Sequence, residues 1–342
     1  MRESHASVAG IEVSIAKGWK PNQYLSNMAV AFFQEPSDYI APDIFPILPV
    51  QQSTGHYYIF NKAELAKDQY SRKPAFGRAA PAVFSHTEGT YSVSVDQIII
   101  GIDQIQTLDY QRSGAPATID PRRAKVRMAT EQSKIHLDHL FAEGFFKASA
   151  WSNVYTGASS TSGTNFKYLD DANSDVIGLF GEFRKKMLLA GRRRPNRLTL
   201  GIDVFNALCR HPQILERILP GGTPAAPADV TEMALARLLQ VDQVKVLYGT
   251  ENTAALGQTE NMQFLFNPKD ALLTYCPSSP SLEEPSAGYI ITWDPLGNGA
   301  WLTTDAFEGE PGTHSEFVEQ LMSITMKKTC DDLAIYLSGA VE

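Results

Sequence analysis

Alternating and helical runs of apolar side chains divide the 342-residue chain into strands and helices. Aromatic and β-branched residues dominate HYYIF (56–60) and YSVSVDQIIIGI (91–102), a composition typical of strands. Further short strands are expected at VKVLYG, MQFLF, ALLTYC, GYIITW and AWLTT, and two more at EFVEQLMSITMKK and LAIYLSG near the end. Because helical runs alternate with these strands, the pattern predicts an α+β protein.

Three segments have the period of an amphipathic helix. Residues 120–147 begin with a capping Asp120 and with Pro121 at the favoured first position, and Gly144 is not expected to end this long helix. A second helix is expected over 174–190, capped by Asn173 or Ser174 and stopped by Gly191. Its predicted buried stripe is Val176, Phe180, Phe183 and Met187. A third helix, in 229–241, opens with a capping-box arrangement of Asp229 and Glu232.

Two stretches do not fit a simple helix or strand. Residues 40–50, IAPDIFPILPV, are apolar but contain Pro42, Pro46 and Pro49, which predicts an extended strap lying on its own domain or on a neighbour. The polar stretch of about 30 residues between HYYIF and YSVSVDQIIIGI is too long for an ordinary hairpin loop. A long two-stranded finger projecting from the body accounts for it.

Composition and charge narrow the class of protein. The chain is 43% hydrophobic and has only three cysteines, which indicates a globular protein with reduced thiols, and no apolar run approaches the length of a membrane span. Its net charge of −8 is uneven, with a balance of +4 over residues 1–228 and −12 over 229–342. Such a division fits solvated faces, attraction between copies of the chain, or a surface that does not adhere to DNA.

Candidate chemistry is sparse. His136 and His139 lie three residues apart on the long helix, but the sequence suggests no third metal ligand. Asp170 and Asp171 form a candidate carboxylate pair without a base or nucleophile nearby, and helix capping explains them better. The basic cluster from Arg184 to Arg197 lacks interleaved aromatic residues. We therefore expect no catalytic residues, no cofactor and no metal, and a subunit of an assembly.

The order of these parts resembles the major capsid proteins of tailed double-stranded-DNA bacteriophages. The resemblance is carried by SNMAVAFFQEPSDYIAPDIFPILPVQQSTGHYYIFNKAEL (26–65), the finger, the capped long helix, and the RLTLGIDVFNAL and VKVLYGTENTA segments. The IAPDIFP strap, followed by a strand and an Asn-Lys turn, is its most specific piece. The resemblance covers nearly the whole chain in order, although only about forty residues are specific.

The resemblance implies the tailed-phage capsid (Johnson) fold, of class α+β. Its parts would be an N-terminal arm (1–54), an extended β-hairpin loop (55–91), a peripheral domain (92–173 and 313–342) with a spine helix (119–148), and an axial domain (174–312) with a central mixed sheet. Contacts between subunits would be made by strap residues, loop cations and glycines of an axial loop: Ile44, Phe45, Ile47, Leu48, Lys62, Lys67, Arg72, Lys73, Arg78, Gly221 and Gly222.

The resemblance also implies a function and partners. The chain would assemble with itself into hexamers and pentamers of an icosahedral head, in the bacterial cytoplasm, and remain in the virion around double-stranded DNA that it contacts non-specifically. A separate scaffolding protein is expected because the arm begins close to Met1, together with a portal and a possible decoration protein. Acids of the C-terminal third would keep the inner wall from adhering to DNA: Glu308, Glu310, Glu316, Glu319, Asp331 and Asp332.

Two other functions stay open. An encapsulin-like bacterial shell protein has the same fold and encloses protein cargo in place of a genome. A soluble hydrolase using the Asp170–Asp171 region belongs to a different class and would form only small oligomers.

Overall fold

A computed structural model describes most of the chain. The described residues are 39–60, 64, 66–70, 72, 73, 75–78, 81, 82, 84–103, 121–218, 230–255, 257–281, 284–297 and 300–342. They fall into two compact units. Unit 1 contains residues 96–103, 121–131 and 302–322, and unit 2 contains the other described residues.

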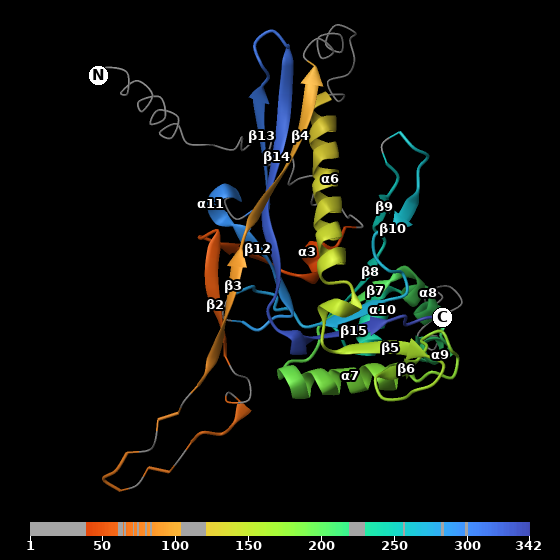
Figure 1. The fold of residues 1–342 in the computed structure, drawn as a ribbon. Helices are drawn as coiled ribbons and strands as arrows, with labels where there is room; N and C mark the ends of the chain where they lie inside the picture. Colours follow the sequence, from red (N-terminus) through yellow and green to blue (C-terminus); the bar gives the residue numbers. More distant parts are fainter. Residues whose placement is uncertain are drawn as a thin grey trace. The chain divides into compact units, whose positions relative to one another are not determined.

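A six-stranded mixed sheet forms the larger core of unit 2 (Figure 1). Its strand order is β6 (Asn165–Lys167), β5 (Val154–Ala158), β15 (Ala334–Ser338), β11 (Ala271–Thr274), β7 (Arg197–Gly201) and β8 (Gln243–Leu247). Strand β11 runs antiparallel to both neighbours, whereas the outer pairs are parallel. The central strands are apolar without alternation because both faces of the sheet are buried.

Helices pack on this sheet and complete its core. They are α7 (Val176–Gly191), α8 (Ile202–Arg210), α9 (Pro212–Ile218) and α10 (Glu232–Leu239). The predicted stripe Val176, Phe180, Phe183 and Met187 of α7 is buried in the core cluster. The periodicity of the sequence therefore predicted the buried face of this helix.

The ends of these helices differ from the expected ones. Asp175, and not Asn173 or Ser174, caps α7 by accepting a hydrogen bond from the backbone N–H of Gly178 at 3.0 Å. Gly191 is the last helical residue, and the left-handed residue after it is Arg192 (φ 58°). Thr231 caps α10 by accepting from Ala234 N at 3.2 Å, whereas Asp229 lies outside the described residues.

A second sheet of unit 2 holds the strap. Strand β1 (Ile47–Val50) pairs in parallel with β12 (Gly288–Trp293), which pairs antiparallel with residues 324–328 of β14 (Ser315–Lys328). Strand β1 lies at the edge of this sheet, where Pro49 is tolerated. The prediction of an extended strap is wrong over residues 41–44, which form one helical turn, α3 (Ala41–Ile44), with Pro42 in its first turn.

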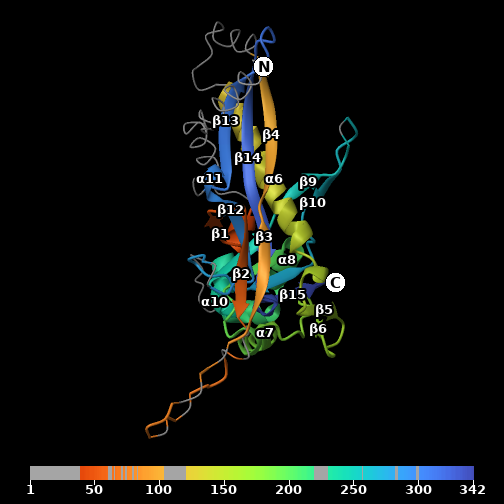
Figure 2. The ribbon, with the colours of Figure 1, turned by 60° about the vertical axis from the view of Figure 1, so that its left-hand side comes forward.

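The projecting finger of unit 2 begins as a two-stranded hairpin (Figure 2). Strand β2 (Thr54–Phe60) pairs antiparallel with β3 (His86–Ser92), from Thr54 opposite Ser92 to Phe60 opposite His86. The single strand expected over 91–102 is thus two, because Val93 separates β3 from β4 (Ser94–Asp103). The described residues between 66 and 85 extend away from the rest of unit 2 in both views.

Unit 1 is built on the β13–β14 hairpin. Strand β13 (Leu302–Glu308) pairs with β14 from Leu302 opposite Met322 to Glu308 opposite Glu316, and β4 also pairs with β14. The unit contains the first part of α6 (Pro121–Gly144), in which Thr130 Oγ1 accepts a hydrogen bond at 3.0 Å from Nε2 of the buried Gln320.

The long helix was predicted over 120–147, but α6 ends at Gly144. The chain then turns, and the backbone N–H groups of Phe145 and Phe146 both donate to the carbonyl of Phe141. This turn directs Phe146 onto the rings of Phe266 and Tyr336, at 5.6 Å from each. Burial of this aromatic group therefore outweighs continuation of the helix.

The boundaries expected between the peripheral and axial domains do not coincide with the division of the strands between the six-stranded sheet and the sheet that contains β14. Strands β5 and β15, placed in the expected peripheral domain, belong to the six-stranded sheet together with β7, β8 and β11. Strands β12 and β13, placed in the axial domain, pair with β14. Residues 1–38 of the expected N-terminal arm lie outside the described residues.

Candidate assembly surfaces

The finger carries charge and apolar surface that its own chain does not cover. Lys67, Arg72, Lys73 and Arg78 are exposed. Within the described part of the chain no carboxylate forms an ion pair with any of these four cations. A projecting element with unpaired charges has the properties of a surface that meets another molecule.

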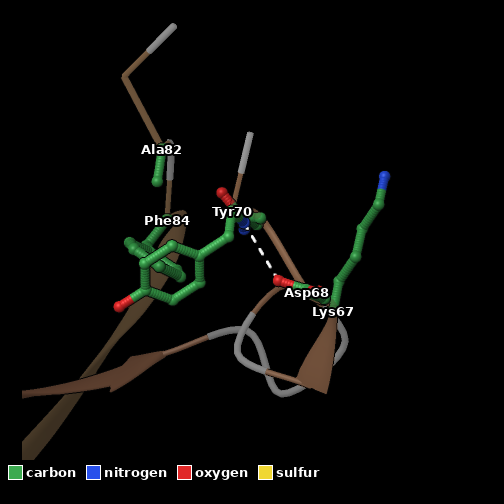
Figure 3. Close-up of a pocket in the computed structure, with 6 residues that line it drawn as sticks. Lys67, Asp68, Tyr70, Ala82 and Phe84 are labelled. Atoms are coloured by element: carbon green, nitrogen blue, oxygen red, sulfur yellow. Dashed lines mark hydrogen bonds between the residues drawn. The ribbon is translucent and has the colours of Figure 1, made fainter. Parts of the chain in front are cut away.

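Large aromatic side chains accompany these cations. Tyr70 and Phe76 are essentially fully exposed, and Phe84 is 45% exposed. Tyr70 and Phe84 line an open hollow of about 400 Å³ together with Lys67, Asp68, Gln69 and Ala82 (Figure 3). The backbone N–H of Tyr70 donates to Asp68 Oδ1 at 3.0 Å, which shapes the turn on which the ring stands.

A hydrogen-bonded link holds the two sides of the finger together. Glu64 accepts hydrogen bonds from the backbone N–H and the hydroxyl of Ser85, and these bonds lower the pKa of the Glu64 carboxyl below its usual value. At the root of the hairpin, Tyr57 and Tyr91 pack with a small apolar cluster that contains Leu48 and Tyr289. The finger is thus anchored on unit 2 while its far part extends outward.

The strap residues are buried within their own chain. Ile44 and Phe45 are at most 1% exposed and Leu48 is 6% exposed, so these side chains have little free surface for the expected contact with a neighbouring subunit. The ring of Phe45 lies 5.2 Å from both Phe141 and Phe145 in edge-to-face contacts. Of the four predicted strap contacts, Ile47 alone keeps partial exposure.

The turn α3 is held at both ends by charged side chains from other elements. At its N-terminal end, Asp138 of α6 accepts hydrogen bonds from the backbone N–H groups of Ile40 (3.2 Å) and Ala41 (2.9 Å). At its C-terminal end, Arg197 of β7 donates to the carbonyls of Asp43 and Ile44, both at 2.7 Å. Lys245 of β8 pairs with the Asp43 carboxylate at 2.8 Å. We call this group the strap clasp.

Asp138 is the electrostatic centre of the strap clasp. Its side chain is fully buried, and this burial, with a smaller contribution from the charge of Asp43, raises the pKa of Asp138 to about 7. The two backbone donors oppose the shift because they stabilise the ionised form. No local pattern in the sequence indicates this role, because Asp138 stands between His136 and His139 and contacts residues almost 100 positions away.

The predicted acidic residues divide between two places. Glu308, Glu310, Glu316 and Glu319 lie on the β13–β14 hairpin of unit 1, where Glu308 faces Glu316 and Asp305 faces Glu319 across the strands. Such like-charged pairs destabilise a hairpin, so local stability does not explain them. Asp331 belongs to unit 2 and is engaged by Lys328 at 3.1 Å and by Ser152.

The other candidate groups have structural contacts. His139 lies 3.4 Å from Glu143 and 3.5 Å from Glu251, and the described residues contain no group of three or more potential metal ligands. Asp171 pairs with Lys167 at 2.8 Å, which lowers the pKa of its carboxyl. His211 nearby uses both ring nitrogens, on Asp171 O and Gln213 N. This arrangement gives the hydrolase hypothesis no support.

Three of the predicted contact residues, Lys62, Gly221 and Gly222, lie outside the described residues. No helix in the described part of the chain is long and apolar enough to cross a bilayer.

Comparison with known proteins identifies a relative among phage proteins, although no protein-family model matches the chain. Over 232 residues the chain is 21% identical to the major capsid protein of Burkholderia phage BcepMu. The match covers 67% of this chain and 66% of the relative, so it spans just under two thirds of that protein.

Solved structures share the fold over nearly the whole chain. A phage-related protein from Bordetella bronchiseptica RB50 superimposes with a TM-score of 0.71 at 18% identity, covering 94% of this chain and 98% of that one. The capsid protein of cyanophage P-SCSP1u superimposes with a TM-score of 0.51 at 11% identity, covering 87% of each chain. A virus-like particle from Pyrococcus furiosus also gives 0.51, at 9% identity, over 93% of this chain and 100% of that one. The chain therefore has the α+β fold of tailed-phage capsid proteins, as the sequence resemblance implied, and is related to a phage major capsid protein.

Proposed function

We propose that this chain is the structural subunit of a phage head, assembling into hexamers and pentamers of an icosahedral shell around double-stranded DNA. The observation that carries the proposal is the capsid fold together with the relation to the BcepMu major capsid protein. The finger adds support, because no carboxylate in the described part of the chain pairs with its exposed cations Lys67, Arg72, Lys73 and Arg78, and Tyr70 and Phe76 are exposed. Negative-stain images of the purified protein should show closed shells.

The finger acts in this proposal as a clamp on a neighbouring subunit. Exposed ion pairs contribute little individually, about 0–1 kcal/mol each, so several per subunit and many per shell are needed. The triple variant Arg72→Glu, Lys73→Glu, Arg78→Glu should keep the unfolding temperature of the subunit and fail to form shells. Assembly of the unmodified chain should weaken as salt rises, because salt screens exposed charges.

A matched control separates the clamp from a general effect of net charge. Lys147, Arg237 and Lys269 are exposed cations outside the finger, and their replacement by Glu changes the net charge equally. This control should assemble. Shells of normal stability from the finger variant would exclude the clamp, although not the capsid function.

The acidic β13–β14 hairpin suits a wall that does not adhere to DNA. Glu308, Glu310, Glu316 and Glu319 give this hairpin negative charge, and like charges directly opposite each other do not stabilise the hairpin itself. Basic residues on an inner wall would bind the phosphate backbone strongly through counterion release. Portal and decoration proteins follow from the resemblance alone.

The encapsulin-like alternative has one observation in its favour, the likeness to the Pyrococcus furiosus particle. Particles purified from their native source distinguish the two functions. Nuclease-resistant DNA of genome length inside the shells supports a phage head, whereas shells that contain protein cargo and no genome support the alternative.

A further inference from the structure

The outward face of helix α7 in unit 2 combines cations with exposed leucines. The buried stripe of Val176, Phe180, Phe183 and Met187 covers one side of the helix. The opposite side presents Lys185 and Leu189, with Lys186 and Leu188 at its two margins and Arg193 and Arg194 just beyond the helix end. We call these six residues the basic leucine face.

The cations of the basic leucine face are available to a partner. No carboxylate in the described part of the chain pairs with Lys185, Lys186, Arg193 or Arg194. Two of them are held in position by aromatic rings, with Lys186 Nζ 4.5 Å from the centre of the Tyr155 ring and the Arg193 guanidinium 5.6 Å from that of Tyr275. The rings thus orient two of the positive charges, and Glu182, one turn before Lys185 and Lys186, is exposed on the same helix without an ion pair to either lysine.

The leucines distinguish this face from a simple patch of positive charge. Leu189 is 75% exposed and Leu188 is 43% exposed, although both sit on a well-formed helix whose core side is already filled. Residues three and four apart are neighbours on a helix, so Leu189 has Lys185 and Lys186 one turn before it and the arginines after it. An apolar centre flanked by cations is the result.

We propose that the basic leucine face docks an acidic amphipathic helix of another protein, whose aliphatic side chains cover Leu188 and Leu189 while its carboxylates meet the surrounding cations. Burial of the two leucines removes apolar surface from water, and charge complementarity orients the two helices. Duplex DNA would satisfy the cations but leave both leucines in contact with water. The exposed leucines therefore favour a protein partner over nucleic acid.

The test uses the full-length chain in unassembled form and a labelled synthetic peptide. This probe is a helix with leucines at every third and fourth position and glutamates on either side. A second peptide of the same charge has serines in place of the leucines. The leucine peptide should bind about tenfold more tightly or better, since about 1.4 kcal/mol corresponds to each factor of ten.

Variants of the face locate the binding. Leu189→Ser should weaken binding of the leucine peptide about tenfold and leave binding of the serine peptide unchanged. The double variant Lys185→Glu, Arg193→Glu should abolish binding of both peptides. Met262→Ser and the double reversal Lys147→Glu with Lys269→Glu are matched controls, because Met262 is 58% exposed and both lysines are exposed elsewhere on unit 2. Both controls should bind like the unmodified chain.

Two results would overturn the proposal. One is equal binding of the two peptides, or a Leu189→Ser variant that binds the leucine peptide normally. The other is a short duplex DNA that binds more tightly than either peptide and responds to charge reversal but not to Leu189→Ser. Neither result depends on shell formation, so failure of this proposal would leave the proposed capsid function untouched. The capsid function is tested separately, by the formation of shells.

Discussion

At the scale of single residues, Asp138 shows how burial and hydrogen bonding compete for one carboxyl. Its pKa is raised to about 7 in the folded chain, against a usual value of 3.8. The folded state therefore binds one more proton than the unfolded chain between about pH 4 and pH 7. The contribution of Asp138 to stability is greatest at low pH and is lost as pH rises through 7.

We predict that Asp138→Asn removes this pH dependence. The free energy of unfolding of the unmodified chain, minus that of the variant, should fall by up to about 1.4 kcal/mol per pH unit between pH 4 and pH 7 and then level off. Denaturant unfolding at several pH values measures this difference, in which other titrating groups cancel. A difference that is constant with pH would show that Asp138 titrates normally.

At the scale of elements, the β2–β3 hairpin depends on glycines that face tyrosines. Gly55 lies opposite Tyr91 and Gly89 opposite Tyr57 in the strand register. A Cβ on Gly89 would lie 2.4 Å from the Tyr57 ring, so each ring covers the backbone of the glycine across from it. Glycine weakens a strand by itself, but here it permits a tyrosine to pack flat at the root of the finger.

Gly89→Ala should therefore destabilise unit 2 by about 1–3 kcal/mol, because the Tyr57 ring must leave its position. The control is Gly144→Ala, since a Cβ at Gly144 meets no atom within 4 Å. In a chain that already carries Tyr57→Ala, the loss of unfolding free energy caused by Gly89→Ala should largely vanish. A double-mutant cycle of unfolding free energies measures this coupling between Tyr57 and Gly89. Additive effects would mean that the ring and the glycine are independent.

At the scale of the whole molecule, the strap contributes to the stability of unit 2. We predict that a chain beginning at residue 47 is less stable than one beginning at residue 39 by several kcal/mol. The shorter chain lacks Ile44 and Phe45, each worth about 1.5–3 kcal/mol when buried, and leaves Asp138 buried without its two donors. Comparison of the two truncated chains by denaturant unfolding isolates residues 39–46.

Equal stability of the two truncated chains would show that the strap clasp contributes little. Because Ile44 and Phe45 are buried in their own chain, loss of the strap should destabilise the subunit itself. The finger and the strap therefore differ in role. The finger exposes charged and aromatic side chains, whereas Ile44 and Phe45 of the strap are buried in the core of their own subunit.

The sequence by itself determined the elements whose side chains repeat with a clear period. The stripe of α7, the start of α6 and the apolar strands β7, β8, β11, β12, β14 and β15 follow from local patterns, because one face of each element must be buried. The order of the parts also indicated the capsid fold. The charges of the finger could be read directly, since exposed residues need no partner in the chain.

Only the tertiary structure decided which distant segments meet. Asp138 and Arg197 convert part of a proline-rich strap into a helical turn, and an aromatic cluster ends α6 at Gly144. Strand β15 joins the six-stranded sheet while β12 and β13 pair with β14. None of these outcomes has a local signature, because the free energy that selects them comes from contacts between residues far apart in the sequence.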